Sequence, residues 1–338
     1  TISAMTDLWT NLDRIIGAAP DAGALRMHGL GPIAAWRMRE RGEPVPADVD
    51  RLAHGAAYAS VTAAPLLQKV IDILQEPVLV LKGPEVARLY PERTLRTYGD
   101  LDLLVADLPS AERKLLDAGF AELMPNRKLE GHHHDSPLGL GNLALMIELH
   151  RSPGWLRWLT PPSDAELLRV AVPSATGVDG AYALPPEPLA LFLASHAWRH
   201  NPYLSIVHLV DIELIRRQTD PVAVMTLARR WGMDRVWTHL CAMIDWYIYQ
   251  DGPVPGPVHR WWARHLHETR EQTLLEYYLG SWGRGLAAPT PLEQVETIAH
   301  DVRFSFTAHS WQSRRQKLGR IAHGARSLAR PASRHLKG

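Results

Sequence analysis

Two aspartates separated by one residue mark the clearest chemistry in this sequence. Asp100 and Asp102 flank Leu101 at the start of an apolar run that extends to Val105. If the run is a strand, its side chains alternate between two faces, so both carboxylates project to one side. Two carboxylates held a few ångströms apart repel each other unless a cation neutralises them, and Mg²⁺ prefers oxygen ligands of this kind. The pair predicts a metal site, and a solvated strand edge is the alternative.

A third carboxylate lies within a second apolar run, residues 145–149. Glu148 interrupts this run, and His150 falls on the same predicted face as Glu148. An unpaired carboxylate is costly to bury, so Glu148 needs a partner. If the two runs form neighbouring strands, Glu148 completes a cluster with Asp100 and Asp102. Three carboxylates can hold two metal ions for an in-line displacement at phosphorus.

Residues suited to phosphate binding precede the aspartates. Lys82 and Gly83 follow the apolar run 78–81, and Pro84 suits the first position of a helix because its missing N–H costs nothing there. Backbone N–H groups at a helix N-terminus bind phosphate, and glycine lets the phosphate approach closely. Lys82 adds a positive charge, and Arg96 offers bidentate contacts to phosphate oxygens. With the carboxylates, these residues predict a metal-dependent phosphate site.

The order of these motifs resembles a known family. The runs LKGPE (81–85), LYP (89–91) and RTYGDLDLLV (96–105) are similar to the uncharacterised nucleotidyltransferase family of the DNA polymerase beta-like nucleotidyltransferase superfamily. The run IELH (147–150) resembles its third acidic motif, and the helical segment with His196, His200 and Asp211 is similar too. The resemblance covers roughly residues 20–215, and the Arg-x-x-Gly-Asp-x-Asp segment is its most specific part.

The resemblance implies an activity and a set of ligands. It implies that Asp100, Asp102 and Glu148 bind Mg²⁺ or Mn²⁺ and that the region of Gly83 holds a nucleoside triphosphate. The expected reaction transfers a nucleoside monophosphate, AMP from ATP, with release of pyrophosphate; a small molecule, a peptide or protein, and an RNA end stay open as acceptors. The superfamily motif is usually Gly-Ser or Gly-Gly, whereas Pro84 follows Gly83 here. A non-catalytic nucleotide- or partner-binding module that retains the fold is therefore the alternative.

Two histidines show the spacing of paired zinc ligands. His196 and His200 are four residues apart on a predicted helix, but no glutamate follows His196, and a zinc hydrolase would need a third ligand as well. We interpret the pair as polar residues that line a nucleotide or acceptor pocket, with core histidines and a zinc hydrolase as alternatives. Asp211 is expected to pair with His208, three residues earlier on the same helical face.

The elements that must position these residues predict an α+β or α/β fold with a small mixed sheet. Residues 1–75 show helical periodicity; strands and helices then alternate, and the pattern from Pro186 onward is helical. Ser163 and Glu166 form a predicted capping box. We therefore expect an N-terminal helical region (1–75), a nucleotidyltransferase core (76–160), a larger C-terminal helical region (161–313) and a basic tail (314–338).

Composition excludes several classes of protein. With 338 residues, 46% of them hydrophobic and 22% charged, the chain can bury a full core, so disorder over most of its length is excluded. Cys241 is the single cysteine, which excludes an internal disulfide and a multi-cysteine zinc site. No run reaches the roughly 18 apolar residues of a membrane span, and Asp7 and Asp13 stand where a signal peptide would be apolar. We expect a cytoplasmic protein.

The formal net charge of +1 conceals a basic tail. Between Arg314 and Gly338 there are eight basic residues and no acidic one, so the rest of the chain carries 29 basic against 36 acidic residues. Such a tail could bind nucleic acid, an anionic surface or an acidic patch on the body of the protein. A solvated basic helix end is the alternative.

Overall fold

Four helices precede the first strand. The computed structural model describes residues 2–123, 136–200, 202–253, 256–306 and 329–331. The early helices are α1 (Ile2–Gly17), α2 (Ala22–Met27), α3 (Gly31–Glu40) and α4 (Ala47–Leu74). The glycine- and proline-containing segment 42–46 lies in the loop between α3 and α4. The long α4 then leads directly into the sheet.

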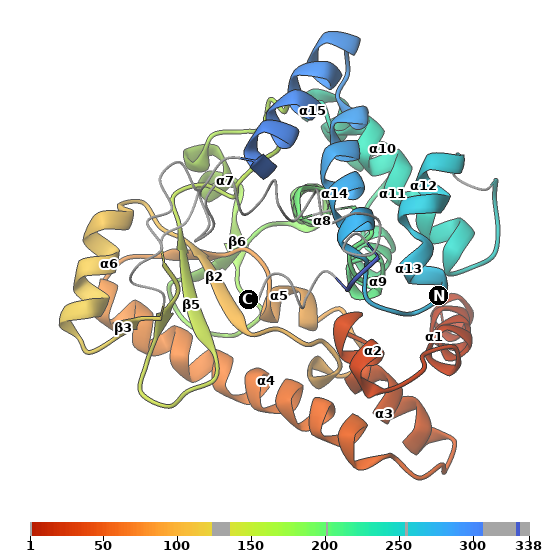
Figure 1. Cartoon of the computed structure of the whole chain (residues 1–338). Helices are drawn as coiled ribbons and strands as arrows, with labels where there is room; N and C mark the ends of the chain where they lie inside the picture. The colour runs from red at the N-terminus through yellow and green to blue at the C-terminus, as the bar shows by residue number, and fades with distance from the viewer. Residues whose placement is uncertain (1, 124–135, 201, 254–255, 307–328, 332–338) are drawn as a thin grey trace.

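A mixed sheet forms the centre of the molecule (Figure 1). Its strands are β1 (Val78–Val80), β2 (Asp100–Leu104), β3 (Ala121–Glu122), β4 (Leu138–Gly139), β5 (Met146–His150), β6 (Val172–Pro173) and β7 (Ala181–Ala183). Within the described residues their spatial order is β3-β4-β5-β2-β1-β7-β6. The central strand β2 runs parallel to β5 and antiparallel to β1. The predicted α+β fold with a mixed sheet is confirmed.

The sheet extends beyond residue 160, where the sequence analysis ends the α/β core. Helix α7 (Asp164–Val170) begins with the predicted Ser163–Glu166 capping box, and β6 and β7 follow it. β7 pairs in parallel with β1, and β6 forms the outer edge beside β7. The region 161–313, expected to be helical, thus also contains two strands, because strands of two and three residues are too short to show a period.

Helices cover both faces of the sheet. Helix α4 and α6 (Leu108–Asp117) pack on one face, where they bury Leu101 and Leu103 of β2 with Ile147 of β5. Figure 1 shows α4, in orange, running below the strands. Residues of the opposite face, Leu79 and Leu104 among them, join the core formed with α8 (Pro186–Arg199) and α9 (Ile206–Arg216). The even-numbered positions of β2, which carry the two aspartates, therefore face α8 and α9.

Two short helical elements lie between β1 and β2, namely α5 (Pro84–Ala87) and η1 (Arg93–Leu95).

The described chain after α9 is helical, as expected. The later elements are α10 (Pro221–Trp231), α11 (Asp234–Tyr247), α12 (Pro257–Trp262), α13 (Arg264–His267), α14 (Leu274–Gly283), η2 (Arg284–Ala287) and α15 (Pro291–Phe306). None of the described helices is both long and apolar enough to cross a membrane. Of the predicted basic tail, only residues 329–331 are described, and the backbone N–H of Leu274 donates to Arg330 O (2.8 Å).

A buried ion pair joins the sheet to the C-terminal helices. Arg96 precedes β2, and its Nε and Nη2 each lie 2.9 Å from a carboxylate oxygen of Asp211 on α9. The hydroxyl of Tyr90 donates to the same carboxylate (2.7 Å). Asp211 thus bonds to Arg96 and Tyr90, and the expected pairing with His208 is wrong. The reason is electrostatic. The buried Arg96 guanidinium needs the negative charge of the Asp211 carboxylate, so this carboxylate pairs with Arg96 and not with His208.

We expect Asp211→Asn to lower the free energy of unfolding by about 3 to 5 kcal/mol, because it leaves the Arg96 charge buried without a counter-charge. Urea unfolding measures the loss. Asp245→Asn is the matched control: Asp245 pairs with Arg216 (2.8 Å), but its side chain is 41% exposed, so the loss should stay below about 1 kcal/mol. Equal losses in both variants would contradict the role given to the buried pair.

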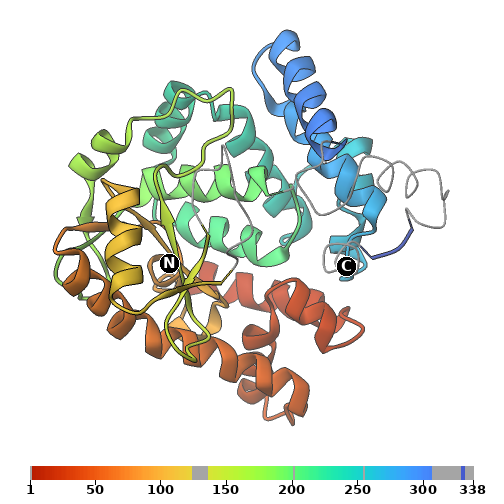
Figure 2. The same ribbon diagram turned by 60° about the vertical axis from the view of Figure 1, so that its left-hand side comes forward.

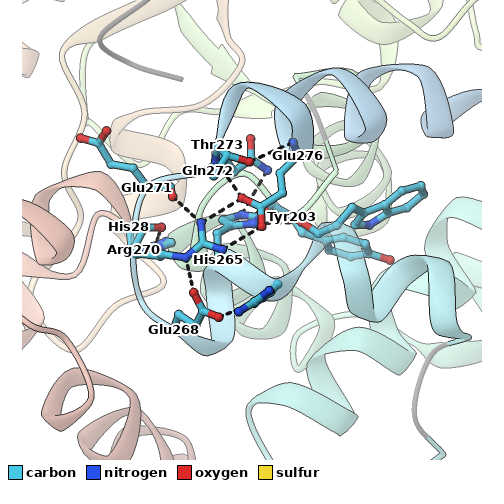
Figure 3. A network of polar contacts seen from close by, with 11 residues as sticks. His28, Tyr203, His265, Glu268, Arg270, Glu271, Gln272, Thr273 and Glu276 are labelled. Atoms are coloured by element: carbon cyan, nitrogen blue, oxygen red, sulfur yellow. Dashed lines mark hydrogen bonds and ion pairs between the residues drawn. The ribbon is translucent and has the colours of Figure 1, made fainter. Parts of the chain in front are cut away.

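A second network ties the segment after α12 to the N-terminal helices (Figure 3). Nε2 of His28, at the end of α2, donates to the carbonyl of Arg270 (3.1 Å), and the His28 ring stacks on His265. Nδ1 of His265 donates to the carbonyl of Trp262 (2.9 Å), while Arg270 forms two bonds with Glu276 of α14 (2.8 and 2.9 Å). Burial lowers the pKa of His28 and of His265 to about 4. Both rings are therefore neutral at physiological pH.

The low pKa of His28 predicts a loss of stability in acid. The unfolded chain binds this proton near pH 6.5 and the folded chain only near pH 4, so stability is present above 6.5 and falls as the pH drops toward 4. His28→Gln keeps a donor for the Arg270 carbonyl. Between about pH 7 and pH 5, its free energy of unfolding should fall by roughly 2 kcal/mol less than that of wild type. Urea unfolding at both pH values measures this. His54→Gln, at an exposed site on α4, is the control; an unchanged pH dependence in His28→Gln would refute the assignment.

Candidate active site

The pairing of β2 with β5 brings the predicted carboxylates together. Asp102 lies directly opposite Glu148, and Asp100 lies opposite Met146. Directly opposite residues project to the same face, so Asp100, Asp102, Glu148 and His150 share the face toward α8 and α9. The condition that the two strands are neighbours is confirmed. Asp102 is buried in the central strand rather than at a solvated edge.

The cation beside the aspartates is Lys82, two residues after the end of β1. Its Nζ lies 2.7 Å from Oδ2 of Asp102 and 3.3 Å from Oδ1 of Asp100. Burial alone would lower the pKa of Lys82, but the charges of Asp102 and Asp100 hold it above its usual value. In this structure Lys82 therefore offsets part of the negative charge of the carboxylates, for which the sequence had predicted a metal ion. Its predicted contact with phosphate stays a prediction.

His150 and Glu148 complete the cluster around Asp102. Nε2 of His150 lies 3.0 Å from Oδ1 of Asp102 and 3.8 Å from Oε2 of Glu148. Burial raises the pKa of Asp102, but the charge of Lys82 and the hydrogen bond with His150 outweigh it, and this pKa lies well below its usual value. Burial, together with the charges of Asp102 and Asp100, raises the pKa of Glu148. The cluster thus holds more negative charge than its own cation relieves.

The donor set fits a divalent cation. One ligand atom from each of Asp102, Glu148 and His150 lies within 4.8 Å of the others. Oδ2 of Asp102 is buried, and among the described residues it accepts no hydrogen bond of good geometry and faces the Lys82 ammonium. Carboxylate oxygens suit Mg²⁺ and Mn²⁺. Asp100, which shares Lys82 with Asp102, lies beside this group and can supply a further oxygen.

A pocket of about 140 Å³ opens beside Asp100. It lies between the β1–β2 region and α8 and α9, and its lining includes Lys82, Arg96, Thr97, Tyr98, Asp100, Leu193, His196, Val207, His208 and Asp211. Burial lowers the pKa of His208 to about 4 and that of His196 well below its usual value. The pocket therefore presents two neutral imidazoles next to the carboxylates.

His196 and His200 differ in their surroundings. Their ring centroids are 4.4 Å apart, but only His196 lines the pocket, whereas His200 contacts the Arg199 side chain (2.9 Å) at the end of α8. Among the described residues, neither histidine belongs to a group of three metal-binding side chains. The geometry gives no support to the zinc alternative. Whether His196 or His200 contacts a substrate stays a prediction.

Gly83 and Arg96 serve the local fold. Gly83 has a φ of 66° at the start of α5, where a Cβ would lie 3.4 Å from the carbonyl oxygen of Asp100. Other residues are strained in this conformation. The guanidinium of Arg96 is bound to Asp211 although it lines the pocket. Phosphate contacts by Gly83 and Arg96, as inferred from the sequence, therefore stay predictions.

Two residues near the site were missed in the sequence analysis. His208 lines the pocket from α9, and Arg199 ends α8 close enough to Asp102 and Glu148 to feel their charges. Arg199 stands three residues after His196, a spacing that places both on one helical face. That spacing was the available signal for Arg199. For His208, the sequence indicated only a pairing with Asp211 on the same helix, and this pairing does not form in the structure.

Comparison with known proteins agrees with this geometry. The sequence model of the family described as uncharacterised nucleotidyltransferase matches residues 22–248, about two thirds of the chain. That range contains the sheet, the carboxylate cluster and the pocket, and it ends within the segment that follows α11. The curated proteins contain no match. The chain belongs to the uncharacterised nucleotidyltransferase family, and it is a transferase of nucleotidyl groups.

Proposed function

We propose that this protein transfers a nucleoside monophosphate, AMP from ATP, to an acceptor with release of pyrophosphate. The observation that carries the proposal is the register of β2 and β5, which sets Asp102 opposite Glu148 and adds Asp100 and His150 to the same face. A cluster of carboxylates beside a small polar pocket suits a reaction in which an anionic nucleotide and an acceptor must meet. The family supports nucleotidyl transfer in general.

In this proposal Asp100, Asp102 and Glu148 hold Mg²⁺. When bound, such an ion supplies positive charge that activates the attacking oxygen and neutralises charge on the phosphates. His150 orients the Asp102 carboxylate through its hydrogen bond (3.0 Å). Lys82 lies close enough to the cluster to exchange its carboxylate contacts for phosphate oxygens. Asp100, Asp102, Glu148 and His150 share one face of the sheet, and Lys82 contacts both aspartates.

We propose that the pocket beside Asp100 receives the acceptor group. Its volume of about 140 Å³ suits a small group rather than a whole nucleotide, because sites for drug-sized ligands usually span about 300 to 1,000 Å³. The neutral imidazoles of His196 and His208 can accept a hydrogen bond from an acceptor hydroxyl and hold it beside Asp100. In the transfer, the acceptor oxygen bonds to the α-phosphorus, the bond to the leaving pyrophosphate breaks and the hydroxyl proton is lost to solvent.

A second candidate is a binding module without catalysis. The observation in its favour is Lys82, whose ammonium pairs with both Asp102 and Asp100 and so offsets part of their charge without a metal. Calorimetry with ATP and Mg²⁺, beside radiolabelled transfer to components of a cell extract, separates the two functions. Binding without transfer to any component favours the module.

Removing the paired carboxylates should abolish transfer. We expect the Asp100→Asn, Asp102→Asn double variant to lose at least about 10³-fold in transfer from labelled ATP, because several kcal/mol of charge stabilisation are lost. Circular dichroism and the thermal midpoint establish that the variant folds. Asp107→Asn is the matched control, since Asp107 caps α6 outside the cluster and asparagine caps equally well. Full activity in a folded double variant would sink the mechanism.

Lys82→Met should raise the affinity for Mn²⁺ by tenfold or more. A like charge in contact with the metal ligands opposes the metal by about 4 kcal/mol at an effective dielectric constant near 20, and methionine removes it. Electron paramagnetic resonance of free Mn²⁺ measures binding without nucleotide. Lys114→Met is the control, because Lys114 pairs with Glu76 away from the cluster. Unchanged or weaker binding would mean that Lys82 does not compete with a metal, which favours the module.

A further inference from the structure

The last turn of α8 approaches the carboxylates from the layer opposite the sheet. His196 lines the pocket with Lys82 and Asp100, and Arg199 lies one turn further along the same helical face. Burial and the charge of Arg284 lower the pKa of Arg199 to about 10, while Asp102 and Glu148 oppose that decrease. The charges of Asp102 and Glu148 thus act on the Arg199 guanidinium, and its Nη2 lies 2.9 Å from Nε2 of His200, whose ring centroid is 4.4 Å from that of the pocket residue His196.

A helical unit outside the family match holds this turn in place. Nη1 of Arg284, in η2, donates to the carbonyl oxygen of Arg199 (2.5 Å), and Nε1 of Trp198 donates to the carbonyl of Arg284 (2.9 Å). Asp301 of α15 binds Arg284 through both carboxylate oxygens (2.6 Å each). A positive charge at the C-terminal end of a helix is favourable, because the last carbonyls lack helical partners there. Figure 2 shows α14 and α15, in blue, standing beside the green α8 and α9 layer.

The charges of the site call for such a cation. Asp100, Asp102 and Glu148 face Lys82, so the sheet side alone carries more negative than positive charge. A triphosphate adds further negative charge, and a planar guanidinium binds phosphate oxygens through paired hydrogen bonds. The pocket of about 140 Å³ is smaller than the usual site of a whole nucleotide, so we expect the phosphates to lie beyond it, toward the end of α8 that carries Arg199.

We propose that Arg199 binds the phosphates of the nucleotide and that Arg284 is the positioning residue that, through the Arg199 carbonyl, fixes the end of α8 from which Arg199 reaches them. The proposal rests on the nucleotidyl transfer proposed above. It assigns to the segment after residue 248, which the family match does not include, a part in building the nucleotide site. The triphosphate contact that a Gly-Ser motif would provide is then supplied from α8.

Equilibrium binding of ATP and of adenosine, each with Mg²⁺, tests the proposal in the full-length protein. Arg199→Met should weaken ATP binding about tenfold to a hundredfold, the range expected when a charge-assisted hydrogen-bonding pair is lost. Adenosine has no phosphate, so its affinity should stay within about twofold of wild type. A merely structural role for Arg199 would weaken both ligands alike and would overturn the proposal.

A double-mutant cycle tests the positioning role of Arg284. Arg284→Met should weaken ATP binding in the wild-type background but cause no further loss when Arg199 is already methionine. Arg284→Lys, which keeps a donor for the Arg199 carbonyl, should restore most of the affinity. Asp301→Asn supplies a second route if Arg284→Met does not fold, and it should weaken ATP in the same Arg199-dependent manner. Independent, additive losses would overturn the positioning role.

Arg235→Met is the matched control. Arg235 of α11 also joins the two parts of the chain, through a bond to the carbonyl of Ala288 (2.9 Å), but it lies outside the site. Its ATP affinity should equal that of wild type, and a loss as large as that of Arg284→Met would overturn the proposal. ATP binding that depends on Arg199 without any transfer refutes the proposed reaction alone, whereas transfer by wild type with unchanged ATP affinity in Arg199→Met refutes this inference alone.

Discussion

Negative charge concentrated on one face of two central strands is the constraint on which the rest of the structure depends. The parallel register of β2 and β5 sets Asp102 beside Glu148, and the strand period adds Asp100 and His150 to the same face. Buried carboxylates are costly unless neighbouring groups offset their charge. Lys82, which follows β1, does so at 2.7 Å from Asp102, and His150 of β5 adds a hydrogen bond of 3.0 Å to the same carboxylate. The apolar positions between them anchor the strands on α4 and α6, so the charged face cannot turn away from α8 and α9.

The helical layer opposite the sheet is built around the same constraint. Arg96, which is buried beside the cluster, is balanced by Asp211 of α9, so the joint between the layers adds no net charge to the pocket. Burial keeps His196 and His208 neutral, which gives the pocket polar groups without further charge. Arg199 is the cation that α8 adds near Asp102 and Glu148, and its backbone is held by Arg284. Positive charge therefore reaches the carboxylates from two directions.

The sequence predicted the features that follow from local residue patterns. It did not predict the features that depend on pairing between segments far apart in the chain. The alternation around Asp100, Asp102 and Glu148 predicted one shared face, because the strand period is a local property, and the structure confirms that arrangement. β7 is only three residues long, and no pattern in the sequence predicted that it pairs with β1. The pairing of Arg96 with Asp211 was not predicted, because the two residues lie 115 positions apart along the chain, and the phosphate contact of Arg96 stays a prediction. The Lys82 ion pairs were hidden for a related reason, since only the β1–β2 pairing places that side chain beside the aspartates.

Within the proposed mechanism, charge also decides how the two substrates differ. Asp100, Asp102 and Glu148 against Lys82 and Arg199 leave one net negative charge, which repels a free triphosphate; a divalent cation reverses the sign and makes the site attractive. The nucleotide must then arrive with its metal or after it. The acceptor pocket, in contrast, has no net charge. The charge of Arg96 is balanced by Asp211 and that of Lys82 by Asp100, and both imidazoles are neutral. A second anion would find no unbalanced positive charge there, so the pocket suits a hydroxyl better than a carboxylate.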